Sequence, residues 1–195
     1  EYGLGRMNGP EAIFAAIEAR LPREAGPQRA PLTGRRIVIT AGPTFEPIDP
    51  VRGLTNRSSG KQGYAIAERL ARAGAAVTLI SGPVALATPP GVTRIDVESG
   101  QDMFDASHTA LPCDVFIAVA AVADWRPKNP AAEKQKKTVE PELSVTFVKN
   151  PDILEAVSKH LELRPRLVIG FAAETSDLEA YARAKVDVCI VLGKD

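Results

Sequence analysis

The chain has 195 residues, with 24 basic and 24 acidic side chains and a formal net charge of zero. This length suits a single domain, and the balanced charge argues against a nucleic-acid surface built on bulk positive charge. No apolar run reaches the roughly 18 residues that a membrane span needs, and the start of the chain lacks a signal-peptide pattern. The two cysteines, Cys113 and Cys189, have no C-x-x-C partner, so we expect buried free thiols in a cytoplasmic protein.

Residues 1–33 differ in composition from the rest of the chain. The segment from Pro10 to Leu21 has apolar residues at helical spacing, and Pro10 suits the first turn of a helix. A stretch rich in proline, glycine and arginine follows. We expect a short helix and a linker ahead of a domain that spans residues 34–195.

From Arg35 onward, strand and helix patterns alternate along the chain. Strands are expected at 35–40, 76–81, 93–97, 114–122, 166–172 and 186–192, and helices at 61–73, 99–110, 151–161 and 177–185. The alternating run at 142–148 is expected to be an edge or hairpin strand. This order predicts an α/β fold, a three-layer sandwich with a Rossmann-like, mostly parallel sheet and helices on both faces. The loops after Thr40, Ser81, Val122 and Phe171 are then expected to converge on one edge, where such sheets bind ligands.

The loop at residues 41–60 carries the strongest functional signal. It is rich in glycine, proline and hydroxyl groups, and it ends in Ser58-Ser59-Gly60-Lys61, where a helix is expected to begin. Helix-start amides, two hydroxyls and a lysine form a site for an anion, such as a phosphate. The loop also carries Asp49, Arg52 and Asn56, which a folded loop can direct at a substrate. The competing interpretation is a surface loop in which Ser58 or Ser59 caps the helix.

Two common nucleotide motifs do not fit this loop. The dinucleotide fingerprint needs G-x-G-x-x-G directly after the strand, but Gly42 is followed by Pro43 and Thr44. A P-loop needs a glycine where Thr55 stands and a Ser or Thr where Gln62 stands. The loop is therefore neither a standard nicotinamide site nor a Walker A motif.

Two later segments carry charged groups of interest. Small residues at Ala120 and Ala121 allow a ligand to approach the backbone, and Asp124 follows at a strand end, where it either holds a divalent cation or caps the next turn. The tract at 133–137, EKQKK, is either solvated surface or a cationic flap that covers a triphosphate. Both segments suit a site that binds a nucleotide.

These segments together resemble the phosphopantothenoylcysteine synthetase family, the ligases of coenzyme A biosynthesis, in their bacterial CTP-using form. The resemblance covers about residues 34–185 and is carried by ordered blocks: ITAGPT at 39–44, EPIDPVR at 46–52, NRSSGKQG at 56–63, VTLISGPVAL at 77–86, AAVADWRP at 120–127, EKQKK at 133–137, KNPDIL at 149–154 and GFAAET at 170–175. Residues 1–13 resemble the tail of the decarboxylase that is usually fused ahead of this ligase. FMN belongs to that decarboxylase, and we expect neither FMN nor decarboxylase chemistry here.

The resemblance implies a reaction in two steps. The carboxylate of 4′-phosphopantothenate attacks the α-phosphate of CTP, which gives an acyl-cytidylate and pyrophosphate; the amine of L-cysteine then displaces CMP. It implies Mg²⁺ as cofactor, and a homodimer that becomes a higher oligomer in the full-length fusion.

The resemblance also assigns site residues. Asn56 and Lys134 match catalytic residues, and Asp124 matches the cation-binding carboxylate. Arg52, Asn56 and Ala121 match the substrate side. The nucleotide and phosphate positions are Gly42, Ser58, Ser59, Gly60, Lys61, Ala120, Ala121 and Lys136.

Two departures from the family pattern are visible. Arg57 stands where many bacterial relatives have histidine, and family members continue beyond the end of this sequence through a loop that helps hold the nucleotide. The choice between CTP and ATP is therefore left open. Two other functions also stay open: a nicotinamide-dependent oxidoreductase, which predicts an acidic residue where the second strand ends in Ser81-Gly82-Pro83, and a non-catalytic nucleotide-binding module.

Overall fold

The computed structural model describes residues 10–20, 30–135, 143–172 and 188–191. The helix expected at 177–185 lies outside these residues. Among the residues described, no helix is both long enough and apolar enough to cross a membrane.

The core of the molecule is a parallel sheet of six strands in the order β10-β9-β6-β1-β4-β5. The strands are β1 (Arg36–Ala41), β4 (Ala76–Ser81), β5 (Val92–Asp96), β6 (Val115–Ala118), β9 (Leu167–Ala172) and β10 (Val188–Val191). The chain starts in the middle, winds out to β5, returns to β6 beside β1 and winds out to β10. This doubly wound order reverses between β1 and β6, and such reversals are where α/β sheets bind ligands. The predicted fold class is confirmed.

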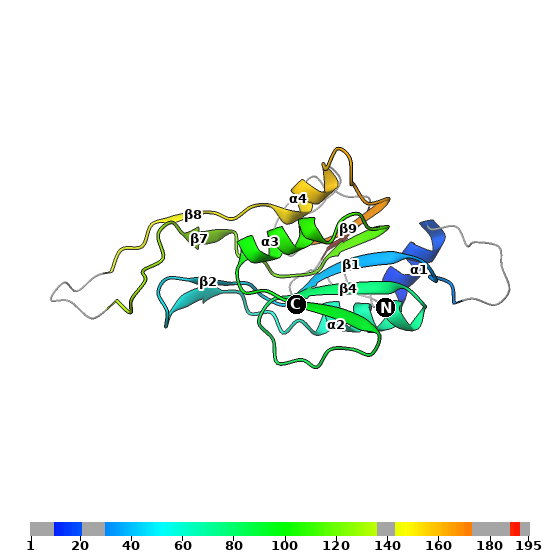
Figure 1. The fold of residues 1–195 in the computed structure, drawn as a ribbon, viewed down its shortest axis with the longest axis horizontal. Helices are drawn as coiled ribbons and strands as arrows, with labels where there is room; N and C mark the ends of the chain where they lie inside the picture. The colour runs from blue at the N-terminus through cyan, green and yellow to red at the C-terminus, as the bar shows by residue number, and fades with distance from the viewer. Residues whose placement is uncertain (1–9, 21–29, 136–142, 173–187, 192–195) are drawn as a thin grey trace.

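Helices cover both faces of the sheet (Figure 1). The helices α1 (Pro10–Arg20) and α2 (Lys61–Arg72) pack on one face, and α3 (Gly100–Thr109) and α4 (Ile153–Ser158) pack on the other. Successive side chains of a strand point to opposite faces, so Ile37 and Ile39 pack with the α1 and α2 layer, whereas Val38 packs with α3 and α4. Burial on both faces explains why these strands are apolar without interruption.

Helix α1 is part of the hydrophobic core. The side chains of Ile13 and Ile17 are buried in the same cluster as β1 and α2, and the guanidinium of Arg69 lies 4.2 Å from the ring centroid of Phe14. The sequence predicts the helix from its apolar spacing, but not its partner. Residues 10–20 therefore pack on the sheet-forming unit as one of its covering layers.

Two short hairpins extend from the carboxyl ends of the strands (Figure 1). The strands β2 (Phe45–Pro47) and β3 (Gly53–Thr55) pair antiparallel, as do β7 (Trp125–Pro127) and β8 (Phe147–Lys149), and β2 packs beside β7. The pairing of β8 confirms that the run at 142–148 contributes a strand outside the main sheet. The strands β2, β3 and β7 are not predicted from the sequence.

Two predicted elements are shorter in the structure. The strand expected at 114–122 ends at Ala118, because the following backbone turns away to bond with the loop after β1. The helix expected at 151–161 spans only Ile153–Ser158. Asp152 caps its start, and beyond its end the ring nitrogen Nδ1 of His160 accepts the backbone N–H of Leu163 at 3.1 Å, which holds a turn instead of another helical turn.

Candidate active site at the carboxyl edge of the sheet

Three of the four loops expected to converge meet at the point where the strand order reverses. The backbone N–H of Ala121 donates to the carbonyl of Gly42 at 2.9 Å, and the N–H of Thr44 donates to the carbonyl of Ala121 at 3.3 Å. The loop after β4 joins them at Gly82, where an added Cβ would lie 1.6 Å from the carbonyl oxygen of Pro43, so only glycine fits. The fourth loop, after Phe171, lies outside the described residues.

The start of α2 also reaches this junction. Gly60 is the N-cap residue with a φ of 73°, a left-handed conformation that glycine adopts without strain, and a Cβ on it would lie 3.4 Å from the Cα of Gly42. No side chain caps α2, and the hydroxyl of Ser58 accepts only the N–H of Gly60, at 3.4 Å. The structure thus contradicts the capping interpretation of Ser58 and Ser59. The first-turn amides of α2 are therefore left without a side-chain cap, next to the exposed Ser59 and Lys61, an arrangement suited to an anion.

Asn56 lies at the same junction. It directly follows β3, is exposed, and donates from its side-chain Nδ2 to the carbonyl of Ala121 at 3.1 Å. The structure therefore brings together the predicted residues Gly42, Gly60, Ala120, Ala121 and Asn56.

The hairpin of β2 and β3 is fixed to the start of α3. The buried carboxylate of Glu46 accepts the backbone N–H of Gly100 at 2.8 Å, and the N–H of Phe45 donates to the carbonyl of Glu98 at 2.8 Å. A carboxylate at a helix N-terminus is stabilised by the first-turn amides and the helix dipole. The hairpin that leads into Asn56 is thus held to the opposite helix layer.

The turn of this hairpin contains an ion pair between the buried Asp49 and the part-exposed Arg52. The Asp49 side chain is 0% exposed and that of Arg52 is 45% exposed, and Oδ2 of Asp49 lies 3.0 Å from Nε of Arg52. The Arg52 guanidinium, helped by backbone N–H groups of Val51, Gln135 and Arg52, holds the pKa of Asp49 well below its usual range. The structure therefore places the guanidinium of Arg52, predicted on the substrate side, against Asp49.

Of the lysines in the EKQKK tract, the structure describes only Lys134. Lys134 is exposed and precedes Gln135, whose backbone N–H donates to Asp49 at 3.1 Å. Lys136 lies outside the described residues.

Asp124 is exposed near the start of β7, and its surroundings are organised by Asn150. The side-chain Nδ2 of Asn150 donates to the carbonyl of Ala123 at 2.7 Å, and its backbone N–H donates to the carbonyl of Asp124 at 2.8 Å. The N–H of Ala123 in turn donates to the buried hydroxyl of Thr44 at 3.0 Å. Asp124 does not serve as the N-cap of any described helix, so the structure does not support the capping alternative.

The carboxylate of Asp124 fits a cation that takes most of its ligands from a phosphate. Within the described ranges, no group of three or more His, Cys, Asp or Glu side chains is arranged to hold a metal ion. Magnesium commonly binds through one or two carboxylates together with substrate phosphates and water. One accessible carboxylate at the strand ends is enough for that mode.

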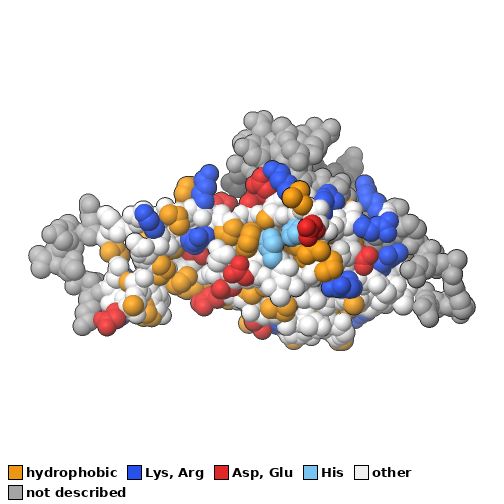
Figure 2. All heavy atoms as spheres, turned by 45° about the horizontal axis from the view of Figure 1, so that its top comes forward, with side chains coloured by type: hydrophobic (Ala, Val, Ile, Leu, Met, Phe, Trp, Pro, Cys, Tyr) orange, Lys and Arg blue, Asp and Glu red, His pale blue; other side chains and the backbone are white. Residues whose placement is uncertain are grey.

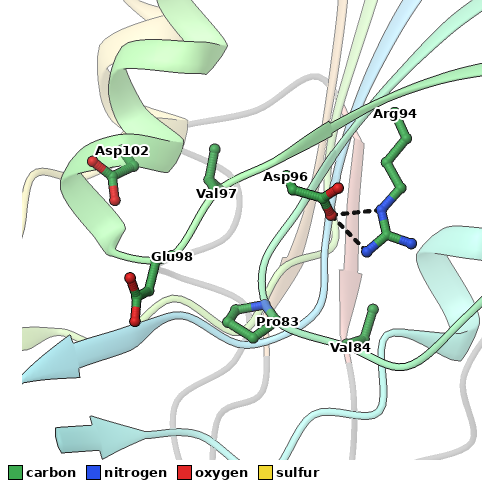
Figure 3. Close-up of a pocket in the computed structure, with 7 residues that line it drawn as sticks. All are labelled: Pro83, Val84, Arg94, Asp96, Val97, Glu98 and Asp102. Carbon is green, nitrogen blue, oxygen red and sulfur yellow. Dashed lines mark hydrogen bonds and ion pairs between the residues drawn. The ribbon is translucent and has the colours of Figure 1, made fainter.

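A separate open groove lies at the carboxyl ends of β4 and β5 (Figure 3). Its lining contains none of the predicted site residues, and three of its charged groups have internal partners: Arg94 pairs with Asp96 at 2.6 Å, and Asp102 accepts the backbone N–H of Ser99 at 2.9 Å. That bond from Ser99 lowers the pKa of Asp102. At the end of β4 the hydroxyl of Ser81 is buried and pairs with Tyr64 at 2.8 Å, so that position offers no acidic group for a nicotinamide ribose.

Cys113 is a half-buried free thiol away from these loops, beside the α3 and α4 layer. Burial raises its pKa to about 12, so the thiol stays protonated at neutral pH and is a poor nucleophile. The expectation of a free thiol is confirmed for this residue. Cys189 lies in β10.

Comparison with known proteins gives a family match over most of the chain. Residues 32–189 match the model of the DNA/pantothenate metabolism flavoprotein C-terminal domain. The chain is 50% identical over 189 residues to the coenzyme A biosynthesis bifunctional protein CoaBC of Vibrio vulnificus, covering 96% of this chain and 45% of that protein. It is 53% identical over 188 residues to CoaBC of Escherichia coli, covering 95% of this chain and 45% of that protein. The chain thus spans less than half the length of the curated relatives it matches.

Solved structures agree with this match. The crystal structure of the C-terminal domain of a CoaBC protein is 46% identical with a TM-score of 0.68, covering 81% of this chain and 74% of that one. A Cab2 variant in complex with phosphopantothenate-cysteine has a TM-score of 0.64 at 16% identity, covering 94% of this chain and 77% of that one, and so shares the fold alone.

The ion pair in the hairpin turn predicts a pH-dependent contribution to stability. Because the folded-state pKa of Asp49 is lowered, its contribution is present above the ordinary carboxyl pKa of about 3.9 and is lost as the pH falls through the folded value. Asp49→Asn should therefore lower the free energy of unfolding most at pH 7, and the gap to wild type should shrink below about pH 4. Urea unfolding at several pH values measures this gap.

Thr33→Ala serves as the control for this experiment, because it removes an exposed local hydrogen bond and no titratable group. A gap for Asp49→Asn that stays constant from pH 7 to pH 3 would contradict the assigned role of the ion pair.

Proposed function

Since the chain belongs to the family of the DNA/pantothenate metabolism flavoprotein C-terminal domain, we propose that it is a phosphopantothenate–cysteine ligase of coenzyme A biosynthesis. It joins 4′-phosphopantothenate to L-cysteine, uses CTP and releases CMP and pyrophosphate. The CoaBC relatives support this assignment by their names and by their identity of about half over nearly the whole chain. The chain covers less than half the length of those relatives. We therefore assign to it only the ligase reaction and not every activity of the longer proteins.

The observation that carries the proposal is the position of Asn56 at the reversal of strand order. Its side-chain amide is held on the carbonyl of Ala121, within the same junction that presents the open amides at the start of α2. An amide donor, main-chain N–H groups and a helix N-terminus in one place suit a substrate that is both a polyanion and an acyl donor. The N-terminus of α2 binds a phosphate group, and Asn56 faces the acyl centre.

The first step forms the acyl-cytidylate. The carboxylate oxygen of 4′-phosphopantothenate forms a bond to the α-phosphorus of CTP, and the bond from that phosphorus to the bridging oxygen of pyrophosphate breaks. Two anions must approach each other, so the main contribution of the protein is positive charge and alignment. Lys61 and the α2 amides supply positive charge from one side, and Lys134 supplies positive charge from the EKQKK tract. Both lysines are exposed.

The second step forms the amide. The neutral amine of L-cysteine forms a C–N bond to the acyl carbon, and the oxygen of that carbonyl gains negative charge. The bond from the acyl carbon to the phosphate oxygen then breaks, CMP leaves with its electrons, and the nitrogen gives up one proton to solvent. Asn56 donates to the developing oxyanion, and Ala120 and Ala121 allow the intermediate to approach the backbone. Asp124 would hold Mg²⁺, which would neutralise charge on the nucleotide phosphates.

A pyrophosphate-release assay tests the proposed function directly. Wild-type protein with CTP, magnesium and 4′-phosphopantothenate should release pyrophosphate, and amide should appear only when L-cysteine is added. Replacing CTP with ATP measures nucleotide choice. If no nucleotide gives pyrophosphate release with 4′-phosphopantothenate, the chain is not a ligase, and nucleotide binding without turnover would instead indicate a binding module.

Asn56→Asp should spare activation and slow amide formation by about 10²-fold, because a carboxylate cannot donate to the oxyanion and repels it. The acyl-cytidylate should then accumulate and be detectable by mass spectrometry of quenched reactions. Asn129→Asp, an exposed change that lies outside the junction, is the control. Equal losses of pyrophosphate release and amide formation in Asn56→Asp would show that the residue does not act at the acyl carbon.

Asp124→Asn should raise the magnesium concentration required for half-maximal activity by about tenfold, since one anionic ligand is lost. Titration of activity against magnesium at fixed CTP measures the shift. Asp105→Asn, on the exposed surface of α3, should leave the titration unchanged. The same half-maximal concentration in wild type and Asp124→Asn would remove Asp124 from the cation site.

We also propose that the protein is a homodimer formed through its two hairpins. Large hydrophobic side chains are exposed there: Val51 (61%), Leu54 (41%), Trp125 (47%), Leu143 (59%) and Phe147 (37%). Figure 2 shows hydrophobic side chains mixed with Lys and Arg at the left end of the molecule, where the hairpins lie in Figure 1. Clustered exposed apolar groups on monomers are uncommon and mark interaction sites.

Leu143→Asp should convert the dimer to a monomer, because it places a charge within the apolar cluster. Light scattering at micromolar concentration gives the mass of each variant. Leu161→Asp is a matched control, because Leu161 is 100% exposed but lies in the turn after α4. A wild-type protein that is already monomeric would refute the proposal, as would equal masses for wild type and Leu143→Asp.

A further inference from the structure

The backbone of Gln135 is held at both of its polar groups by one ion pair. Its N–H donates to Oδ2 of Asp49 at 3.1 Å, and its carbonyl accepts from Nη2 of Arg52 at 2.7 Å. Gln135 lies 86 residues after Asp49 in the chain, so the contact joins the turn between β2 and β3 to the segment that follows β7. We refer to this arrangement of Asp49, Arg52 and Gln135 as the backbone clamp.

The Asp49 side of the backbone clamp is rigid. Oδ1 of Asp49 accepts the backbone N–H groups of Val51 and Arg52, each at 2.9 Å, and Oδ2 accepts Nε of Arg52 at 3.0 Å. The N–H of Ile48 donates to the carbonyl of Arg52 at 2.8 Å across the same turn. A buried charge with its hydrogen bonds made holds its partners in fixed geometry, and hydrogen bonds to a charged group are the strong ones.

A second contact ties the same two segments together. The N–H of Ala131 donates to the carbonyl of Ile48 at 2.9 Å. The segment from Ala131 to Gln135 is thus attached to the hairpin turn at both of its ends. Lys134 lies between these attachments, and its side chain is exposed.

The side chain of Gln135 does not account for this position. Its Oε1 is buried and finds no hydrogen-bond partner among the described residues. The backbone clamp, rather than the glutamine side chain, holds this residue in place.

We propose that Asp49 and Arg52 are positioning residues that fix Lys134 relative to Asn56. The hairpin that carries the backbone clamp runs through β3 directly into Asn56. The same hairpin therefore positions both Asn56 and Lys134. The inference rests on the proposed role of Lys134 in the ligase reaction. It assigns Arg52 a function through the backbone of Gln135, in addition to any contact that its exposed portion makes with substrate.

The test compares Asp49→Asn with Lys134→Gln and with the double variant. Asp49→Asn keeps the size of the side chain but removes the charge that holds Arg52 and Gln135. It should lower kcat by about 10- to 100-fold, as displacement of a reacting group does, with KM for 4′-phosphopantothenate within about twofold of wild type. In the Lys134→Gln background, Asp49→Asn should cost no more than about twofold further, because the group it positions is already absent.

Proteolysis gives a readout that does not depend on activity. Trypsin should cut the bond after Lys134 several-fold faster in Asp49→Asn than in wild type, whereas the cut after Lys128 should proceed at the same rate in both. Lys128 is a control within the same molecule, because its N–H bonds to the carbonyl of Thr146 on the other hairpin. Glu68→Gln, which breaks an exposed ion pair with Arg72 on α2, should change neither cleavage rate nor kcat.

Arg52→Lys provides a second variant should Asp49→Asn fail to fold. Arg52 is part exposed, and a lysine keeps the charge but lacks the planar fork that contacts Asp49 and the Gln135 carbonyl together. It should show the same faster cut after Lys134 and the same non-additivity with Lys134→Gln. If instead it raises only KM, Arg52 acts on substrate and not through the backbone clamp.

The outcomes separate this inference from the proposed function. An unchanged cut after Lys134, or losses of kcat that multiply in the double variant, would overturn the backbone clamp in an enzyme that still forms the amide. If wild-type protein forms no amide at all, the ligase assignment fails, and the cleavage rates alone then decide whether Asp49 and Arg52 fix the segment.

Discussion

The geometry of the candidate site depends on one contact, the crossing of the loop after β1 over the loop after β6. Gly42 and Thr44 form backbone hydrogen bonds with Ala121 there, just beyond the ends of β1 and β6, between which the sheet reverses its winding. The start of α2, Asn56 and Gly82 each contact this crossing. A parallel sheet that reverses its winding leaves a crevice at this point, and here glycine at positions 42, 60 and 82 lets the loops approach one another closely.

The elements of the main sheet were predictable from sequence because each has a strong local signal. Runs such as Arg36–Ala41 and Val115–Ala118 are apolar throughout, and α2 and α3 have a clear apolar face and a terminal signal in Gly74 or in Ser99 with Asp102. The strands β2, β3 and β7 were not predicted, because each has three residues, contains proline or glycine, and pairs only with another short strand. Their stability comes from tertiary contacts, which single-sequence patterns do not carry.

The residues of the site were predictable from the sequence, but their hydrogen-bond partners were not. Asn56, Gly60 and Ala121 were identified from motif order, and the structure brings them together. The partnership of Asp49 with Gln135 and that of Glu46 with Gly100 had no sequence signal, since 86 and 54 residues separate the partners. The capping alternative for Ser58 and Ser59 was wrong. Both are good capping residues by type, but Gly60, in a left-handed conformation, takes the N-cap position of α2.

The placement of α1 has a consequence for how a larger protein built on this unit would work. In Figure 1, α1 lies toward the amino ends of the sheet strands, with the hairpins at the opposite end. Ile13 and Ile17 anchor it there, within the core. A catalytic unit joined ahead of α1 would be attached at the end of the sheet that is far from Asn56. To reach Asn56, a product made in that unit would then have to travel the length of the sheet or come from a neighbouring copy.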